Sequence, residues 1–116
     1  MSTQISALAG HPAQGPQLAD VGKLIAAYYS LQPDPAVATQ RVSFGTSGHR
    51  GTSLDGSFNE AHVLGITQAI CLYRQWQGFD GPLFIGIDTH GSASAANSAV
   101  RAGASRSRCC CFRTSP

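Results

Sequence analysis

The strongest constraint on the fold is a strand, loop, helix and strand pattern that occupies residues 41–87. Val42 and Phe44 alternate with polar neighbours, as in a short strand. Leu83–Ile87 is apolar apart from Gly86, as in a strand buried on both faces of a parallel sheet. A helix between two such strands makes a βαβ unit with a right-handed crossover. The pattern predicts an α/β fold, an incomplete three-layer α/β/α domain with a mostly parallel sheet.

The helix inside this unit is predicted over Ser57–Gln77. Ser57 and Glu60 have the S-x-x-E spacing of a capping box, and Gly78 stands where a helix usually ends. Apolar residues cover a wide arc of this helix, which indicates packing on more than one side.

A shorter helix is predicted over Asp20–Leu31, with Asp20 as its N-cap. Apolar residues follow at the spacing of one helix face, and Pro33 and Pro35 end the pattern.

The loop after the first strand reads Gly-Thr-Ser-Gly-His-Arg-Gly, residues Gly45–Gly51. Its glycines let backbone N–H groups approach an anion, and Thr46 and Ser47 add hydroxyl groups. Arg50 adds a forked, permanently charged donor that suits phosphate oxygens. The loop is neither a Walker A loop nor a Rossmann fingerprint. Because glycine-rich loops often serve only as tight turns, the pattern alone favours a structural turn over a phosphate site.

Three blocks of the chain read FGTSGHRG at Phe44–Gly51, SFNEAHVLGITQAI at Ser57–Ile70 and IGIDTHG at Ile85–Gly91. In order and separation they resemble the bacterial phosphoglucomutases of the α-D-phosphohexomutase family. The segment Leu18–Pro35 is also similar to the N-terminal region of that branch. The resemblance covers residues 18–91, and it implies the first part of domain I of a four-domain enzyme.

Members of that family interconvert glucose 1-phosphate and glucose 6-phosphate, with a phosphoserine as phosphoryl donor and Mg²⁺ neutralising charge. The resemblance therefore implies a hexose phosphate as the partner of the intact enzyme. It also implies that Arg50 faces the reacting phosphate and that Thr46, Ser47 and Gly48 help to form the same phosphate-binding wall. His49 stands at a variable place in the motif, which implies only a weak role.

Several loops of this family are absent from these 116 residues, namely the phosphoserine loop, the metal loop, the sugar loop and the C-terminal phosphate loop. We therefore expect no catalytic residue, no carboxylate cluster able to hold Mg²⁺, and no activity of the chain alone. Asp88–His90 matches a family segment that we expect to be mostly structural. The alternative is a non-catalytic remnant, or a fragment that depends on a partner.

The sequence changes character after Gly91. Residues 92–116 hold four arginines and no acidic residue, whereas residues 1–91 hold four basic and six acidic residues. We predict a non-homologous, disordered tail over residues 92–116, and we favour out-of-frame translation over a natural extension as its origin. Residues 1–17 are predicted to be a flexible tail, which leaves residues 18–91 as the partial domain. Low stability is expected, because the sheet edge after Leu83–Ile87 is uncovered.

Other sites and partners are not indicated. Cys109–Cys111 are consecutive and lack the spacing of zinc ligands, and Cys71 is expected to be a small core residue. His62 is expected to be a packed or surface histidine. Arginines without aromatic residues between them do not indicate a nucleic-acid site. Neither a membrane span nor a signal peptide is indicated, so the cytoplasm is the expected compartment. The oligomeric state is not indicated.

Overall fold

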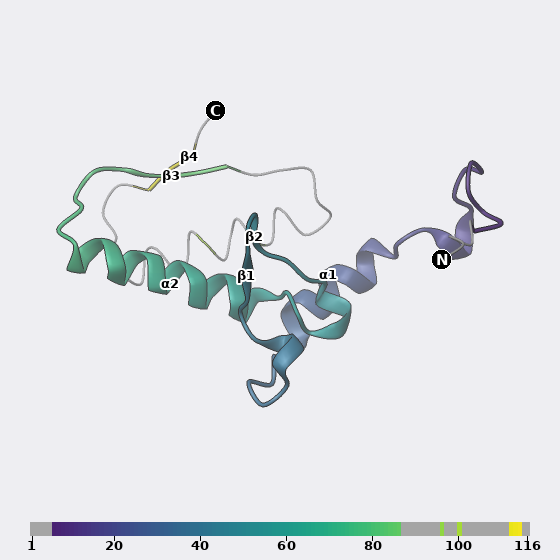
Figure 1. Ribbon diagram of the computed structural model, residues 1–116, viewed down its shortest axis with the longest axis horizontal. Coiled ribbons are helices and arrows are strands. Elements are labelled where there is room, and N and C mark those ends of the chain that lie inside the picture. The colour runs from purple at the N-terminus through teal and green to yellow at the C-terminus, as the bar shows by residue number, and fades with distance from the viewer. Residues whose placement is uncertain (1–5, 87–95, 97–99, 101–111, 115–116) are drawn as a thin grey trace.

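The computed structural model describes residues 6–86, Ala96, Val100 and residues 112–114. Its helices are α1 (Val21–Ser30) and α2 (Glu60–Trp76), and its strands are β1 (Phe44–Gly45), β2 (Gly48–His49), β3 (Leu83–Ile85) and β4 (Phe112–Thr114). Short 3-10 turns occupy Gly15–Gln17, Ala38–Gln40 and Ser53–Asp55. In Figure 1, α1 and the β1–β2 hairpin lie at the N-terminal end of α2, and β3 runs back above the helix. Asp88–His90 and Cys109–Cys111 lie outside the described residues.

Helix α1 begins and ends where its sequence pattern predicts. The side chain of Asp20 accepts a hydrogen bond from the N–H of Lys23 at 2.9 Å, so the expected N-cap is confirmed. Tyr28 is the buried residue of this helix, and it packs with Val63 of α2. Phe58 and Leu64 border this small core. The apolar contact between the two helices thus centres on Tyr28 among the described residues.

The hydroxyl of Tyr28 is buried and has no hydrogen-bond partner among the described residues. Burial, followed by the negative charge of Glu60, raises the pKa of Tyr28 well above its ordinary value. The unfolded chain releases this proton near pH ~10 and the folded chain only at higher pH, so raising the pH above that point favours unfolding. This term costs up to about 1.4 kcal/mol for each pH unit.

Tyr28→Phe is expected to leave stability unchanged or slightly raised near neutral pH, because it removes a buried polar atom without a partner. It is also expected to reduce the loss of stability above pH ~10. Urea unfolding at pH ~9 and ~11 measures both effects. Tyr29→Phe, on the exposed neighbouring ring, is the matched control. A Tyr28→Phe chain that loses as much stability as the wild type would contradict the argument.

The N-cap of helix α2 lies two residues later than the sequence pattern predicts. Its N-cap is Asn59, which forms a capping box with His62, so the expected capping box between Ser57 and Glu60 is wrong. The Ser57 hydroxyl is instead engaged with Thr52, whose N–H donates to it at 3.0 Å. The C-terminal end is as predicted.

Gly78, with φ of +70°, ends α2 in a Schellman motif. The N–H of Gly78 donates to the carbonyl of Gln75, and that of Phe79 donates to the carbonyl of Arg74. Cys71 is fully buried on this helix, which confirms its expected place in the core.

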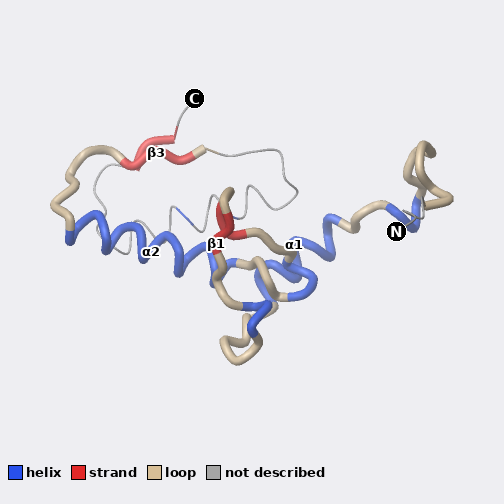
Figure 2. The backbone as a smooth tube through the Cα atoms, viewed as in Figure 1, coloured by secondary structure: helices blue, strands red, loops and turns tan. Residues whose placement is uncertain are grey.

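The described strands form two separate pairs. β1 is antiparallel to β2, with Phe44 opposite His49, and β3 is parallel to β4, with Leu83 opposite Phe112. Figure 2 shows β1 and β3 as separate red segments. The expected βαβ pairing between the Val42–Phe44 segment and the Leu83–Ile87 segment is therefore not found among the described residues. The chain reverses at once after β1, so the backbone of β1 pairs locally.

Strand β3 is covered less than a strand buried on both faces would be. Leu83 and Ile85 are half-buried, whereas 64% of Phe84 is exposed, so the expectation of burial on both faces is wrong for the described residues. Trp76 at the end of α2 is 81% exposed. The division into a tail over 1–17, a domain over 18–91 and a tail over 92–116 stays a prediction, although β4 lies within the last segment.

Candidate functional site

The loop that the sequence predicts as a phosphate-contacting element is a β-hairpin. Thr46 and Ser47 form the exposed turn between β1 and β2, and Gly48 begins β2. Gly48 has φ of +107°, a backbone conformation that residues with a side chain rarely adopt. Arg50 follows β2 directly. The four predicted site residues are thus brought together on one hairpin, within a few residues of its tip.

The side chain of Arg50 is exposed and makes no hydrogen bond or ion pair with any described residue. A guanidinium group keeps its charge at any ordinary pH and carries five N–H donors. Arg41, by contrast, is already engaged, since it donates to the carbonyls of Pro35 and Ala36. Arg50 is therefore available to bind an anion in solution.

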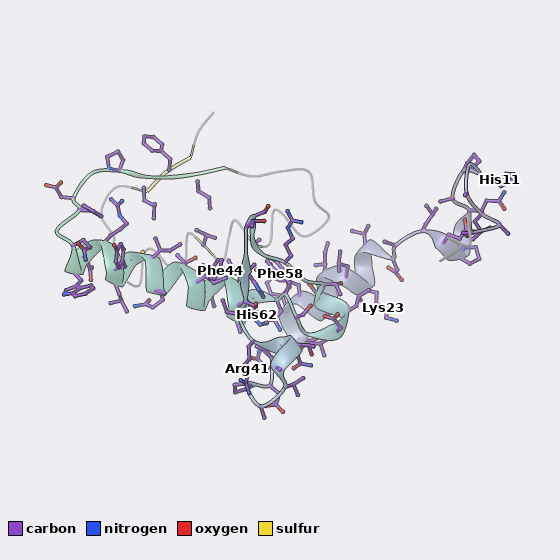
Figure 3. The ribbon with its side chains drawn as sticks, viewed as in Figure 1. His11, Lys23, Arg41, Phe44, Phe58 and His62 are labelled. Carbon is purple, nitrogen blue, oxygen red and sulfur yellow. The ribbon has the colours of Figure 1, made fainter. Side chains whose placement is uncertain are left out.

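His49 holds the hairpin against the start of α2. Its ring stacks on Phe58, with ring centroids 5.7 Å apart and planes inclined by 21°, and lies 5.0 Å from the ring of His62. Its Nδ1 atom lies 3.2 Å from the N–H nitrogen and 3.1 Å from the carbonyl oxygen of Ser43. Figure 3 labels Phe44, Phe58 and His62, which gather around this junction at the N-terminal end of α2.

A cavity of about 360 Å³ opens between the hairpin, α2 and β3. Its walls are almost entirely apolar, and His49 is one of the few polar side chains that line it. Arg50 does not line this cavity. Among the described residues that line it, the cavity offers no set of polar groups for a sugar hydroxyl.

The described residues do not fit a Mg²⁺ ion. No group of three or more His, Cys, Asp or Glu side chains in the described ranges is arranged to hold a metal. Two of the carboxylates accept backbone N–H groups, since Asp34 accepts the N–H of Ala36 and Asp55 that of Ser57. Hydrogen bonds from Ser57 also lower the pKa of Asp55.

His62 is a packed histidine, as the sequence indicates. It is 4% exposed, and its Nε2 atom lies 2.7 Å from the carbonyl oxygen of Gln40. Nε2 must therefore carry a proton, and in the neutral ring Nδ1 accepts the N–H of Asn59 at 3.2 Å. Both nitrogens are engaged in structure, which leaves His62 no role in chemistry.

Two comparisons with known proteins match a part of the chain that includes this hairpin. Residues 41–113 match the family model of phosphoglucomutase/phosphomannomutase, alpha/beta/alpha domain I. The chain belongs to the phosphoglucomutase/phosphomannomutase family. It is 60% identical over 86 residues to a phosphoglucomutase of Komagataeibacter xylinus, an alignment that covers 74% of this chain and 16% of that protein. The resemblance read from the three sequence blocks is confirmed, and so is the α/β fold class.

The match to the phosphoglucomutase/phosphomannomutase family begins at Arg41 and runs to Arg113, so it includes the whole hairpin and the first two residues of β4. The chain spans about one-sixth of the length of the curated relative. No helix in the described part of the chain has the length and apolar character that a membrane crossing needs.

The structure gives His49 contacts that the sequence pattern did not indicate. Its weak expected role followed from its place in the motif, whereas the structure gives it contacts with Ser43, Phe58 and His62. No periodic pattern connects these residues, since Phe58 lies nine positions further along the chain. The sequence offered one indication of these contacts, namely a histidine directly before the charged Arg50.

Proposed function

We propose that this chain is an N-terminal part of a phosphoglucomutase, and that its hairpin forms part of the wall that binds the phosphate of a hexose phosphate. The intact enzyme interconverts glucose 1-phosphate and glucose 6-phosphate by phosphoserine-mediated transfer within the cytoplasm. Mg²⁺ and the phosphoryl donor belong to loops that these residues do not include. The proposal is supported by the family match and by the available guanidinium of Arg50 beside two exposed hydroxyl residues.

The single observation that carries the proposal is that the side chain of Arg50 is exposed and makes no hydrogen bond with the described residues. An arginine that supports a fold usually hydrogen-bonds to the backbone, as Arg41 does at 2.7 Å from the carbonyl oxygen of Pro35. Arg50 has no such contact with the described residues, although it lies between two well-anchored neighbours. An available forked cation at the end of a glycine-containing hairpin suits the oxygens of a phosphate.

Arg50→Ala is expected to weaken the binding of inorganic phosphate and of glucose 1-phosphate by about 10-fold or more, because it removes a charge-assisted pair of hydrogen bonds. The wild-type chain is expected to bind with a Kd on the order of 10 mM, since it offers one wall of a site. Titration monitored by ¹H–¹⁵N NMR measures both values and locates the affected amides.

The matched control is Lys23→Ala, which removes the same charge from the exposed side chain of α1, away from the hairpin (Figure 3). It is expected to leave phosphate binding within about two-fold of the wild type, apart from a small long-range effect of net charge. Equal losses in the Arg50 and Lys23 variants would show non-specific attraction and would overturn the proposal.

A fragment that depends on a partner is the second candidate. It is favoured by the number of large apolar side chains that are exposed among the described residues, with Trp76 at 81%, Phe84 at 64% and Phe44 at 63%. Where such side chains form a contiguous patch, the patch marks a surface that binds a partner. This candidate predicts that the wild-type chain shows no phosphate binding by itself.

A further inference from the structure

Arg50 is flanked on its N-terminal side by a residue that is held in three ways. His49 stacks on Phe58, contacts the ring of His62, and hydrogen-bonds through Nδ1 to the backbone of Ser43. Ser43 lies just before β1, and His49 ends β2, so this bond joins the two ends of the hairpin. The position of the residue before Arg50 is therefore fixed by both the hairpin and α2.

Arg50 is flanked on its C-terminal side by a glycine with no room for a side chain. A Cβ atom at Gly51 would lie 2.8 Å from the backbone carbon and oxygen of Ser57. Real Cβ atoms essentially never show contacts this short, so the chain at Gly51 is packed directly against the backbone before α2. Ser57 is itself held by Thr52 and Asp55.

Arg50 thus has fixed backbone neighbours and a side chain without described contacts. A charged group held in place before its ligand arrives binds more tightly, because less ordering remains to be done on binding. The anchoring of His49 and Gly51 orders the backbone at Arg50 in this way, since it limits the directions in which the guanidinium group can point.

His49 does not face the anion itself. Its Nε2 atom is buried without a partner among the described residues, and the ring lines the apolar cavity that Arg50 does not line. A residue that bound phosphate or moved a proton would need an accessible nitrogen. Its second nitrogen is taken up by Ser43.

We propose that His49 is a positioning residue for Arg50, and that it acts by tying the end of β2 to the backbone of Ser43. The inference rests on the proposed role of Arg50 in phosphate binding. It assigns to His49 no contact with the substrate and no part in proton transfer. Its effect is the orientation of the guanidinium group, and through it the affinity for the phosphate of a hexose phosphate.

His49→Phe tests the inference, because phenylalanine keeps an aromatic ring against Phe58 but removes the bond to Ser43. We expect inorganic phosphate and glucose 1-phosphate to bind about 2–10-fold more weakly, with the helical circular dichroism retained. The backbone amide signals of Arg50 and Gly51 are expected to shift or broaden. His49→Asn, whose short amide can still bond to Ser43, is expected to bind within about two-fold of the wild type.

The matched control is His11→Phe, which makes the same chemical change at an exposed histidine far from the hairpin (Figure 3). It is expected to change neither phosphate affinity nor the Arg50 signals. A folded His49→Phe chain that binds as the wild type does, or a His49→Asn chain no better than His49→Phe, overturns the inference. If His49→Phe unfolds, His49→Asn decides: binding near the wild-type value supports the inference, and a loss as large as that of Arg50→Ala overturns it.

The inference and the proposed function fail in different ways. If the wild-type chain shows no binding that depends on Arg50, the proposed function fails. If binding depends on Arg50 and is indifferent to His49, only the positioning role fails.

Discussion

Asn59→Ala is expected to lower the free energy of unfolding by about 2–4 kcal/mol, which combines the loss of a helix N-cap with a buried hydrogen bond. Asn59 is fully buried, and its Nδ2 donates to the carbonyl oxygen of Leu31 at 2.7 Å. This bond joins the start of α2 to the end of α1, which are 28 residues apart. The described residues include few buried apolar side chains, so the chain has little stability in reserve, and the loss is expected to unfold a large share of the molecules.

The alanine also disturbs His62, the partner of Asn59 in the capping box. His62 in turn hydrogen-bonds to the carbonyl oxygen of Gln40. Asn59 thus connects the start of α2 directly to Leu31, and through His62 to Gln40. Removing one member of such a network leaves the carbonyl of Leu31 without its donor, and the members of a network can be worth more together than pairwise deletions suggest.

Urea unfolding followed by circular dichroism measures the effect. Asn59→Ser keeps a good N-cap and loses the bond to Leu31, so the difference between the serine and alanine variants isolates the cap. Gln32→Ala, at an exposed position after α1, is the matched control and is expected to change stability by no more than about 0.5 kcal/mol. An alanine variant of Asn59 as stable as the Gln32 control would show that this network does not support the fold.

The purified 116-residue chain is expected to give no mutase turnover above the uncatalysed background. The sequence contains no phosphoserine loop, and the described residues contain no carboxylate group arranged for a metal. Positioned charge and a phosphoryl donor supply the rate enhancement in phosphoryl transfer, and enzymes gain about 10⁶-fold or more from such groups. A hairpin that contacts phosphate supplies only one part of this.

A coupled assay with glucose 1-phosphate, read out through the formation of glucose 6-phosphate, measures the turnover. The phosphoglucomutase of Komagataeibacter xylinus, 60% identical over 86 residues, is a suitable positive control. Turnover that rises with the concentration of this chain and falls in Arg50→Ala would contradict the expectation. Turnover that is insensitive to Arg50 would point to a contaminating enzyme.

Local signals in the sequence were sufficient for the ends of two helices. Asp20 caps α1 through a bond to Lys23, three residues away, and Gly78 ends α2 with a positive φ. Both features depend on the chain within one helical turn, so a sequence pattern contains the whole cause. Cys71 is buried for a similar reason, because it lies on the apolar arc of α2.

The start of α2 depended on contacts that no local pattern contains. Ser57 has the spacing of a capping residue, but its hydroxyl bonds to Thr52, and the close approach of Gly51 holds it there. Asn59 gains a partner 28 residues away, which decides between two adequate N-caps. Sequence reasoning therefore placed the helix correctly and its first turn wrongly.

The residues of the candidate site could be predicted from the sequence, but the backbone conformation that brings them together could not. Thr46, Ser47, Gly48 and Arg50 were identified from residue types and from the family resemblance. The antiparallel pairing of β1 with β2 was missed, because a two-residue strand carries too little periodicity to be read. Whether these residues bind phosphate stays a prediction until Arg50 is tested.

The pairing of β3 with β4 has a consequence for the order in which the chain acquires structure. The hairpin and both helices lie within the first 76 residues. Strand β3 instead pairs with Phe112–Thr114, and Leu83 and its partner Phe112 are 29 positions apart. Pairing over 29 positions closes a longer loop than the hairpin does, so it costs more chain entropy before its contacts form. The hairpin and the helix contacts are therefore expected to form first, and β3 keeps an unpaired edge until β4 reaches it.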